Sequence, residues 1–307
     1  MNAASAPDLA RRAALASVAT ALLLGALKAY AAWATGSVAM LGSLADTGLD
    51  LIASLVTLLG VHVAAQPADA DHRFGHGKAE AIAALFQVIV IAMSALAIGA
   101  QAVSRMLAGH LTANPEYGVG VSIVAIVLTF GLLAYQRHVI AQTHSVAIGA
   151  DHVHYQSDLL LNGAVIAALL LDDLLGLNWV DPVFGVAIAL WLFYGAWRAS
   201  TRAIDQLMDR EWPAEKRARF LAIAARHPEL IGIHDLRTRT SGAQDFVQFH
   251  VWVDPAMTMA AVHRVMDEVE AKLMAEFPGT EILIHPDPEG QYDRQGEEDE
   301  ALRETPE

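Results

Sequence analysis

The sequence lacks cysteine and has few charged residues. Its 307 residues include no Cys, only 18% are Asp, Glu, Lys or Arg, and 54% are hydrophobic. Without cysteine the chain forms no disulfide and offers no thiolate, which argues against a soft-metal site for Cu(I) and leaves oxygen and nitrogen as the expected metal ligands. The low charge content and a mean hydropathy of +0.36 favour a membrane protein over an ordinary soluble domain.

Six apolar stretches have about the length of a membrane span. Each meets or nearly meets the roughly 20 residues needed to cross about 30 Å of hydrocarbon. They lie near residues 13–35, 38–65, 79–103, 118–135, 144–171 and 179–197. We therefore predict a polytopic α-helical membrane protein whose six transmembrane helices form a domain over residues 1–209.

The basic residues of the predicted loops are distributed asymmetrically. Placing both termini in the cytoplasm leaves only Arg105 outside, as the positive-inside rule requires. The inner side then holds Arg11, Arg12, Arg73, Lys78, Arg137, Arg198, Arg202 and Arg210. A signal peptide is the alternative for the first apolar run, because Arg11 and Arg12 precede it and small residues follow. That alternative leaves five spans, whereas the loop charges fit six.

After about residue 210 the composition becomes mixed in charge. We predict a small α+β domain over residues 210–290, with helices near 214–226 and 258–276 and strands near 231–239, 245–253 and 280–285. In the second strand Val247, Phe249 and Val251 alternate with Gln248 and His250, so one face is apolar and the other carries the histidine.

The last residues, 291–307, are strongly acidic. They include seven Asp or Glu against two arginines and contribute part of the formal charge of −14. We expect a disordered, solvated tail there, and the acidic balance argues against a nucleic-acid partner.

Two pairs of polar residues stand inside apolar spans. Asp46 and Asp50 lie four residues apart in LADTGLD, and His154 and Asp158 lie four apart in HYQSD. Residues at i and i+4 share one helix face. At 1.5 Å per residue the first pair lies about 12 to 18 Å below the outer surface and the second about 15 to 21 Å above the inner one. Antiparallel packing of the two spans would bring Asp50 to His154 and Asp46 to Asp158.

These carboxylates need compensation. One carboxylate at the middle of a membrane helix costs roughly 2.5 to 3.5 kcal/mol even on lenient insertion scales. For either pair alone, a protonated Asp, an ion pair with Lys28, or a histidine hydrogen-bonded within the bundle would suffice. Three carboxylates and one imidazole at a common depth instead predict a divalent cation, and four O/N ligands suit Zn²⁺, Fe²⁺ or Mn²⁺ better than Ca²⁺.

Two further groups carry metal-ligand residue types. Asp69, His72 and His76 are spaced for ligation in the loop PADADHRFGHGKAE, although a polar loop with helix-capping residues would look the same. The predicted α+β domain holds His234, His250, His263, His285 and Asp287. Surface histidines are common, so the spacing alone leaves the role of this second group open.

Taken together, the motifs resemble the cation diffusion facilitator family, close to its bacterial zinc and ferrous-iron efflux members. The segments GSVAMLGSLADTGLDLIASL, QPADADHRFGHGKAEAIAAL, HYQSDLLLNGA, HDLRTRTSG and HPDP follow the family pattern in order, between about residues 10 and 290. The resemblance implies six transmembrane helices and a cytoplasmic metallochaperone-like domain. It also implies a homodimer in the bacterial inner membrane that exchanges a divalent metal for protons, and thus a secondary active transporter rather than an enzyme.

The resemblance also implies roles for individual residues. These are a transport site of Asp46, Asp50, His154 and Asp158, a loop site of Asp69, His72 and His76, a binuclear cytoplasmic site of His234, His250, His263, His285 and Asp287, and a charge interlock of Lys78 and Asp209 at the dimer interface. Zn²⁺ is the expected cargo and structural ligand, with Fe²⁺ or Cd²⁺ as alternatives. The set of three aspartates with His154 resembles that of zinc-type members, whereas an Asp in place of His154 would resemble manganese-type members. Val153 and Trp252 depart from the pattern and leave gating and fine affinity open.

Two other functions would use some of these residues. An intramembrane aspartyl protease also needs paired membrane carboxylates, but the chain lacks its Gly-x-Gly-Asp segment. A metal sensor would use the cytoplasmic ligands without needing the four mid-membrane ones. Efflux of divalent cations from the cytosol accounts for both sets.

Overall fold

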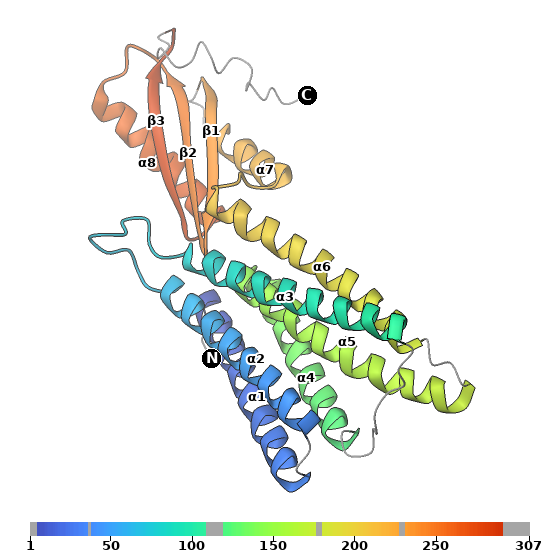
Figure 1. Ribbon diagram of the computed structural model, residues 1–307. Helices are drawn as coiled ribbons and strands as arrows, with labels where there is room; N and C mark the ends of the chain where they lie inside the picture. The colour runs from blue at the N-terminus through green and yellow to red at the C-terminus, as the bar shows by residue number, and fades with distance from the viewer. Residues whose placement is uncertain (1–4, 36–37, 109–118, 176–179, 227–230, 291–307) are drawn as a thin grey trace. The chain divides into compact units, whose positions relative to one another are not determined.

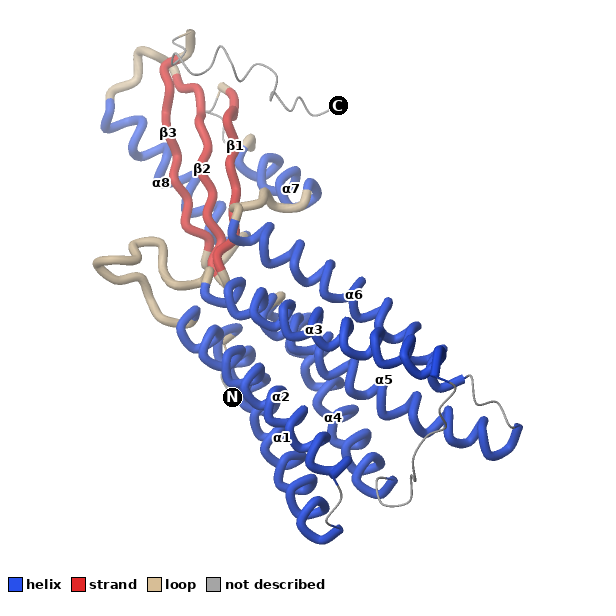
Figure 2. The backbone as a smooth tube through the Cα atoms, in the orientation of Figure 1, coloured by secondary structure: helices blue, strands red, loops and turns tan. Residues whose placement is uncertain are grey.

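The computed structural model describes residues 5–35, 38–108, 119–175, 180–226 and 231–290 (Figures 1 and 2). The chain divides into two compact units, Met1–Ile204 and Asp205–Glu307. The expected acidic tail, residues 291–307, lies outside the described residues.

The first unit is a bundle of long helices (Figure 1). They are α1 (Ala6–Thr35), α2 (Val38–Ala64), α3 (Ala79–Ala108), α4 (Val119–Thr143), α5 (Val146–Leu175) and α6 (Val180–Leu207), the last ending just beyond the unit boundary. Among the described residues, five helices are long and apolar enough to cross a membrane, and α5 is not one of the five. It spans 30 residues but carries Asp151, His152, His154 and Asp158 in its first half. The predicted helical membrane domain is confirmed.

Small residues allow these helices to approach closely. A Cβ added at Gly60 of α2 would lie 2.4 Å from the Cβ of Ala83 on α3, and one added at Gly185 of α6 would lie 2.8 Å from the Cβ of Ala102. Between membrane helices lipid is as apolar as leucine, so close packing and interhelical hydrogen bonds provide the association energy. Helix α2 also contacts α5, the helix that carries His154.

The second unit is a three-stranded sheet with two helices (Figure 2). Its elements are α7 (Ala214–Ala224), β1 (Gly232–Ser241), β2 (Gln244–Val253), α8 (Met259–Glu276) and β3 (Thr280–Pro288). The strand order is β1-β2-β3, with β1 antiparallel and β3 parallel to β2. A parallel pair needs a crossover, and α8 supplies it. The predicted α+β class is confirmed.

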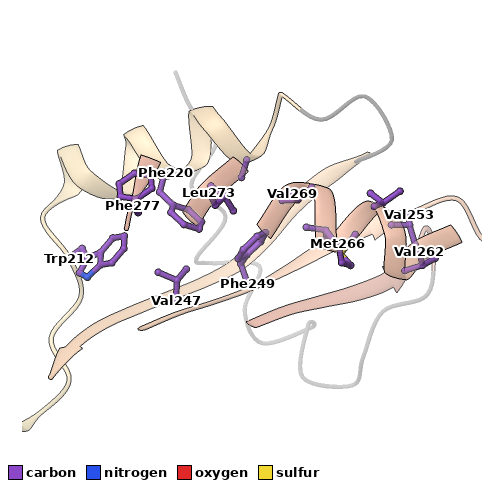
Figure 3. Close-up of a cluster of buried hydrophobic side chains, with 13 residues drawn as sticks. Trp212, Phe220, Val247, Phe249, Val253, Val262, Met266, Val269, Leu273 and Phe277 are labelled. Carbon is purple, nitrogen blue, oxygen red and sulfur yellow. The ribbon is translucent and has the colours of Figure 1, made fainter. Parts of the chain in front are cut away.

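One face of this sheet is buried under the helices (Figure 3). Val247, Phe249, Val251 and Val253 of β2 are all buried and belong to one hydrophobic cluster. That cluster also contains Phe220 of α7, Trp212, Phe277 and the α8 residues Val262, Val265, Met266, Val269 and Leu273. The alternation in the sequence therefore sends the valines and Phe249 to the core, which leaves Gln248 and His250 on the other face.

Phe249 is among the largest fully buried side chains of the second unit. It is 1% exposed and its ring meets that of Phe220 edge to face at 5.5 Å. We expect Phe249→Ala to lower the unfolding free energy of this unit by about 3–5 kcal/mol, because a buried ring is replaced by a cavity. Hydrogen exchange of the β2 and α8 amides in the full-length protein measures this. Met259→Ala, at a side chain that is 80% exposed, is the control; equal exchange in both variants would contradict the assigned core.

Candidate metal centres

The first group of potential ligands lies inside the helical unit. Asp50 of α2 and His154 and Asp158 of α5 each offer one ligand atom, and these atoms all lie within 4.8 Å of one another. The Nε2 of His154 is 3.0 Å from Oδ1 of Asp50. His154 is 3% exposed, whereas the side chain of Asp50 is 20% exposed. The predicted approach of Asp50 to His154 is thus present in the fold.

Asp46, the fourth predicted ligand, is not brought into this group. It lies one turn earlier on α2 and is exposed. Lys28 of α1 is hydrogen-bonded to other groups: its Nζ donates to the Thr47 hydroxyl at 2.6 Å and to the Ser43 carbonyl at 3.3 Å. Two carboxylates and an imidazole therefore converge without an ammonium hydrogen-bonded to them among the described residues.

The second group lies in the loop between α2 and α3. Oδ1 of Asp69 is 3.4 Å from Nδ1 of His72, and its Oδ2 is 3.3 Å from Nε2 of His76. Gly75 has φ +76°, a conformation that glycine adopts readily, and its N–H donates to the His72 carbonyl. This turn folds the two imidazoles toward each other, with ring centroids 4.6 Å apart.

Asp69 is also held by the backbone. Its Oδ1 accepts the N–H of Asp71 at 2.9 Å and that of His72 at 2.7 Å. The hydrogen bond from the His72 backbone lowers the pKa of Asp69, because it favours the charged carboxylate. The loop therefore presents an ionised oxygen beside two imidazoles, although the same bonds would cap a polar turn.

The third group is built by strand register. His234 of β1 pairs with His250 of β2, which pairs with His285 of β3, so three histidines stand side by side across the sheet. The carboxylate of Asp287 contacts all three: Nδ1 of His250 at 2.9 Å, Nε2 of His234 at 3.2 Å and Nε2 of His285 at 3.3 Å. Three of these residues, His234, His250 and Asp287, have ligand atoms within 4.8 Å of one another.

His234 has an environment of its own. Its ring stacks on Trp252 with centroids 4.4 Å apart and an interplanar angle of 27°. Burial lowers the pKa of His234 below its usual value, and the neighbouring His250 adds to that effect. Metal binds the neutral imidazole, so a lowered pKa keeps this ligand available as the solution becomes more acidic.

Three other predicted residues are not part of these groups. His263 of α8 is 77% exposed and lies 3.7 Å from Asp267, away from the histidine row. Lys78 and Asp209 belong to different units, and within the second unit Arg239 lies 3.6 Å from Asp209. Their charge interlock, like the ligand role of His263, remains a prediction.

The sequence reasoning missed two aspartates. Asp235, next to His234, adopts φ +49°, and its Oδ2 lies 3.7 Å from Nε2 of His250. Asp151 is completely buried in the helical unit and is hydrogen-bonded to three other helices. Both could have been found: Asp235 by its place in HDLRTR, and Asp151 because it lies three and seven residues before His154 and Asp158 on one helix face.

The donor chemistry of the three groups is alike. Each combines imidazole nitrogen with carboxylate oxygen, the set that suits Zn²⁺ and other first-row divalent ions. Only the first group lies within a helical bundle fit to cross a membrane. Each of the three groups thus offers donor atoms of the kind that binds divalent cations.

Comparisons with known proteins agree with this arrangement. Residues 14–208 match the cation efflux transmembrane domain family, and residues 212–289 match the cytoplasmic domain of cation efflux proteins. The chain is 42% identical over 285 residues to the cation-efflux pump FieF of Pectobacterium atrosepticum, covering 92% of this chain and 95% of that protein. It is 40% identical over 293 residues to FieF of Escherichia coli O127:H6, covering 94% and 96%.

Solved structures match the C-terminal part of the chain. A structure of the transporter CzrB in its zinc form is 34% identical, covers 28% of this chain and 99% of its own, and has a TM-score of 0.27. The two domain matches and the extent of the FieF alignments decide the assignment. The chain belongs to the cation efflux family, the cation diffusion facilitators, and is a membrane transporter that exports divalent metal ions.

Proposed function

We propose that this protein exports Zn²⁺ from the cytosol across the bacterial inner membrane in exchange for protons. The convergence of Asp50, His154 and Asp158 within the helical unit carries the proposal, since a divalent cation compensates two half-buried carboxylates and binds a neutral imidazole. Asp46 completes the site in this proposal when α2 turns toward α5. Fe²⁺ and Cd²⁺ are the other candidate cargoes.

The exchange follows from the chemistry of the ligands. An imidazole binds metal only when it has no proton on the ligating nitrogen, and a carboxylate binds it when ionised, so metal and protons compete for the same atoms. Metal binds from the cytosolic side, the bundle rearranges, and protons displace the metal on the far side. Both termini and the α+β unit lie in the cytosol, and two copies of the chain form a dimer.

The zinc preference rests on the nitrogen ligand. The imidazole of His154 favours Zn²⁺ over the harder Mn²⁺. The loop and cytoplasmic groups offer the same donor types, and we propose that they collect metal and stabilise the dimer.

Metal uptake into proteoliposomes with an imposed pH gradient tests the function. With a panel of Zn²⁺, Fe²⁺, Cd²⁺ and Mn²⁺, we expect Zn²⁺ flux in the direction opposite to the protons and little Mn²⁺ flux. Zinc flux that ignores the gradient would exclude proton exchange. Binding with no flux of any metal would favour a sensor.

Asp50→Ala should abolish zinc flux and leave a folded protein, because it removes a ligand and relieves like-charge crowding at the same time. The loss is measured as zinc uptake by proteoliposomes, and folding by the thermal melt. Asp71→Ala, at an exposed loop carboxylate, is the control and should transport normally. Full zinc flux through Asp50→Ala would remove Asp50 from the transport site.

His154→Asp should shift the metal preference toward Mn²⁺, because a harder oxygen replaces nitrogen at suitable reach. The ratio of Mn²⁺ to Zn²⁺ uptake measures this, and Asp158→Glu, which keeps an oxygen ligand, serves as the matched control. An unchanged ratio in His154→Asp would show that the imidazole does not select the metal.

The cytoplasmic histidines should contribute metal-dependent stability. A ligand that binds the folded form at 100 times its Kd adds about 2.7 kcal/mol. His250→Ala combined with His285→Ala should therefore reduce the zinc-induced rise in melting temperature. Gln248→Ala, on the same strand face, is the control. If the double variant melts like the parent with and without zinc, the row across the sheet is not a metal site.

A further inference from the structure

One buried acidic group in the helical unit is not among the metal ligands. Asp151 of α5 is 0% exposed. Among the described residues no lysine, arginine or histidine forms an ion pair with it. A carboxylate in such a place is stable only when its charge is compensated or removed.

Neutral donors from three neighbouring helices surround Asp151. Ser17 Oγ of α1 lies 2.6 Å from its Oδ2, Gln136 Nε2 of α4 lies 2.8 Å from the same oxygen, and Gln87 Nε2 of α3 lies 2.8 Å from Oδ1. Gln87 also donates to Thr57 of α2 at 3.1 Å. The three donors and Thr57 are all buried. The site is therefore built by the fold, and it carries no compensating positive charge of its own.

The Ser17 hydroxyl allows the site to exist in two protonation states. Its Oγ lies 2.6 Å from Asp151 Oδ2 and 3.2 Å from the Ala13 carbonyl oxygen, and its single proton can serve only one of them at a time. When Asp151 is ionised, Ser17 donates to the carboxylate. When Asp151 is protonated, its O–H donates to Ser17, and Ser17 donates to Ala13. The site can thus accommodate either protonation state of Asp151 by rotation of the Ser17 hydroxyl, with every heavy atom in place.

Asp151 also stands where the metal charge would act on it. It shares one face of α5 with His154 and Asp158, at spacings of three and seven residues. The titratable groups that act on it are His154 and Tyr155 of α5 and Asp50 of α2. The side chains that donate to it from α1, α3 and α4 do not titrate, although His152 of α5 contacts Gln136, with Nδ1 3.2 Å from Oε1. The charge of the group formed by Asp50, His154 and Asp158 is consequently the part of its environment that metal binding changes.

We propose that Asp151 is a proton-binding site separate from the metal ligands: it holds a proton while the membrane site is free of metal and releases that proton when metal binds. The inference rests on the proposed metal–proton exchange and adds a carrier to it. On release, the carboxyl O–H bond breaks, the electron pair stays on Asp151 and the proton is transferred to water. The two positive charges of a metal one helical turn away favour the ionised carboxylate in a medium of low dielectric constant.

The number of protons released per zinc ion tests this. It is measured by titration calorimetry in buffers of different ionisation enthalpy, on a parent protein whose loop and cytoplasmic groups are disabled by His72→Ala, His250→Ala and His285→Ala. Asp151→Asn should still bind zinc but release fewer protons, by up to about one per zinc. Asp151→Glu should behave like the parent. Glu80→Gln is the matched control, a buried carboxylate of α3 that accepts a hydrogen bond from Ser145 at 2.6 Å, and it should leave the number unchanged.

Equal proton release in Asp151→Asn and its parent, across the pH range in which zinc binds, would overturn the proposal. Should Asp151→Asn fail to fold, infrared difference spectra of the parent and Asp151→Glu decide. A protonated-carboxyl band that disappears on zinc binding and is shifted in Asp151→Glu supports the proposal, and a band identical in both overturns it. Failure of proton-coupled zinc flux in the parent would instead count against the proposed function, because the calorimetric number is measured without transport.

Discussion

Ionised carboxylates inside a membrane-spanning bundle need compensation, and the helical unit of this protein is organised around that need. Asp50 and Asp158 share the space around one imidazole, His154, where a divalent cation can bind all three. Asp151 also lies inside the bundle, but its carboxylate is enclosed by hydrogen-bond donors from three other helices. In a bundle of this kind, helix packing and the charge state of the buried groups depend on each other.

In the second unit, strand register determines which potential ligands lie side by side. Because β1, β2 and β3 align His234, His250 and His285, a row of imidazoles forms on the sheet face that the helices leave open. Asp287 joins the row from β3 and contacts each ring. The opposite face is filled by valines, Phe249 and the α8 side chains, so the hydrophobic core fixes which way the histidines point.

Much of this could be predicted from the sequence, because the signals were local. Length and hydropathy define the helices, alternation defines β2, and equal membrane depth predicts that Asp50 approaches His154, which the fold shows at 3.0 Å. Their roles as metal ligands, like those of the loop and cytoplasmic residues, are still predictions. Register between strands that are distant in sequence was beyond local reasoning, and it is what places His285 beside His250.

Two departures have physical reasons. Residues at i and i+4 differ by about 40° around a helix, so the rotation of α2 decides whether Asp46 or Asp50 faces α5, and sequence spacing does not fix that rotation. His263 belongs to α8, which packs on the apolar face of the sheet, so within one chain it lies apart from the histidine row. Asp151 shares a helix face with His154 and Asp158, but its enclosure by Ser17, Gln87 and Gln136 could not be predicted locally, because these partners come from three different helices.

The place where the transported cation binds can be seen by anomalous diffraction at the zinc edge, from crystals grown with Zn²⁺. If Asp50, His154 and Asp158 hold the cation within the membrane bundle, a metal peak lies among these three side chains, with ligand distances of about 2.0–2.2 Å. Zinc peaks confined to the loop and the sheet, with none among Asp50, His154 and Asp158, would contradict this assignment.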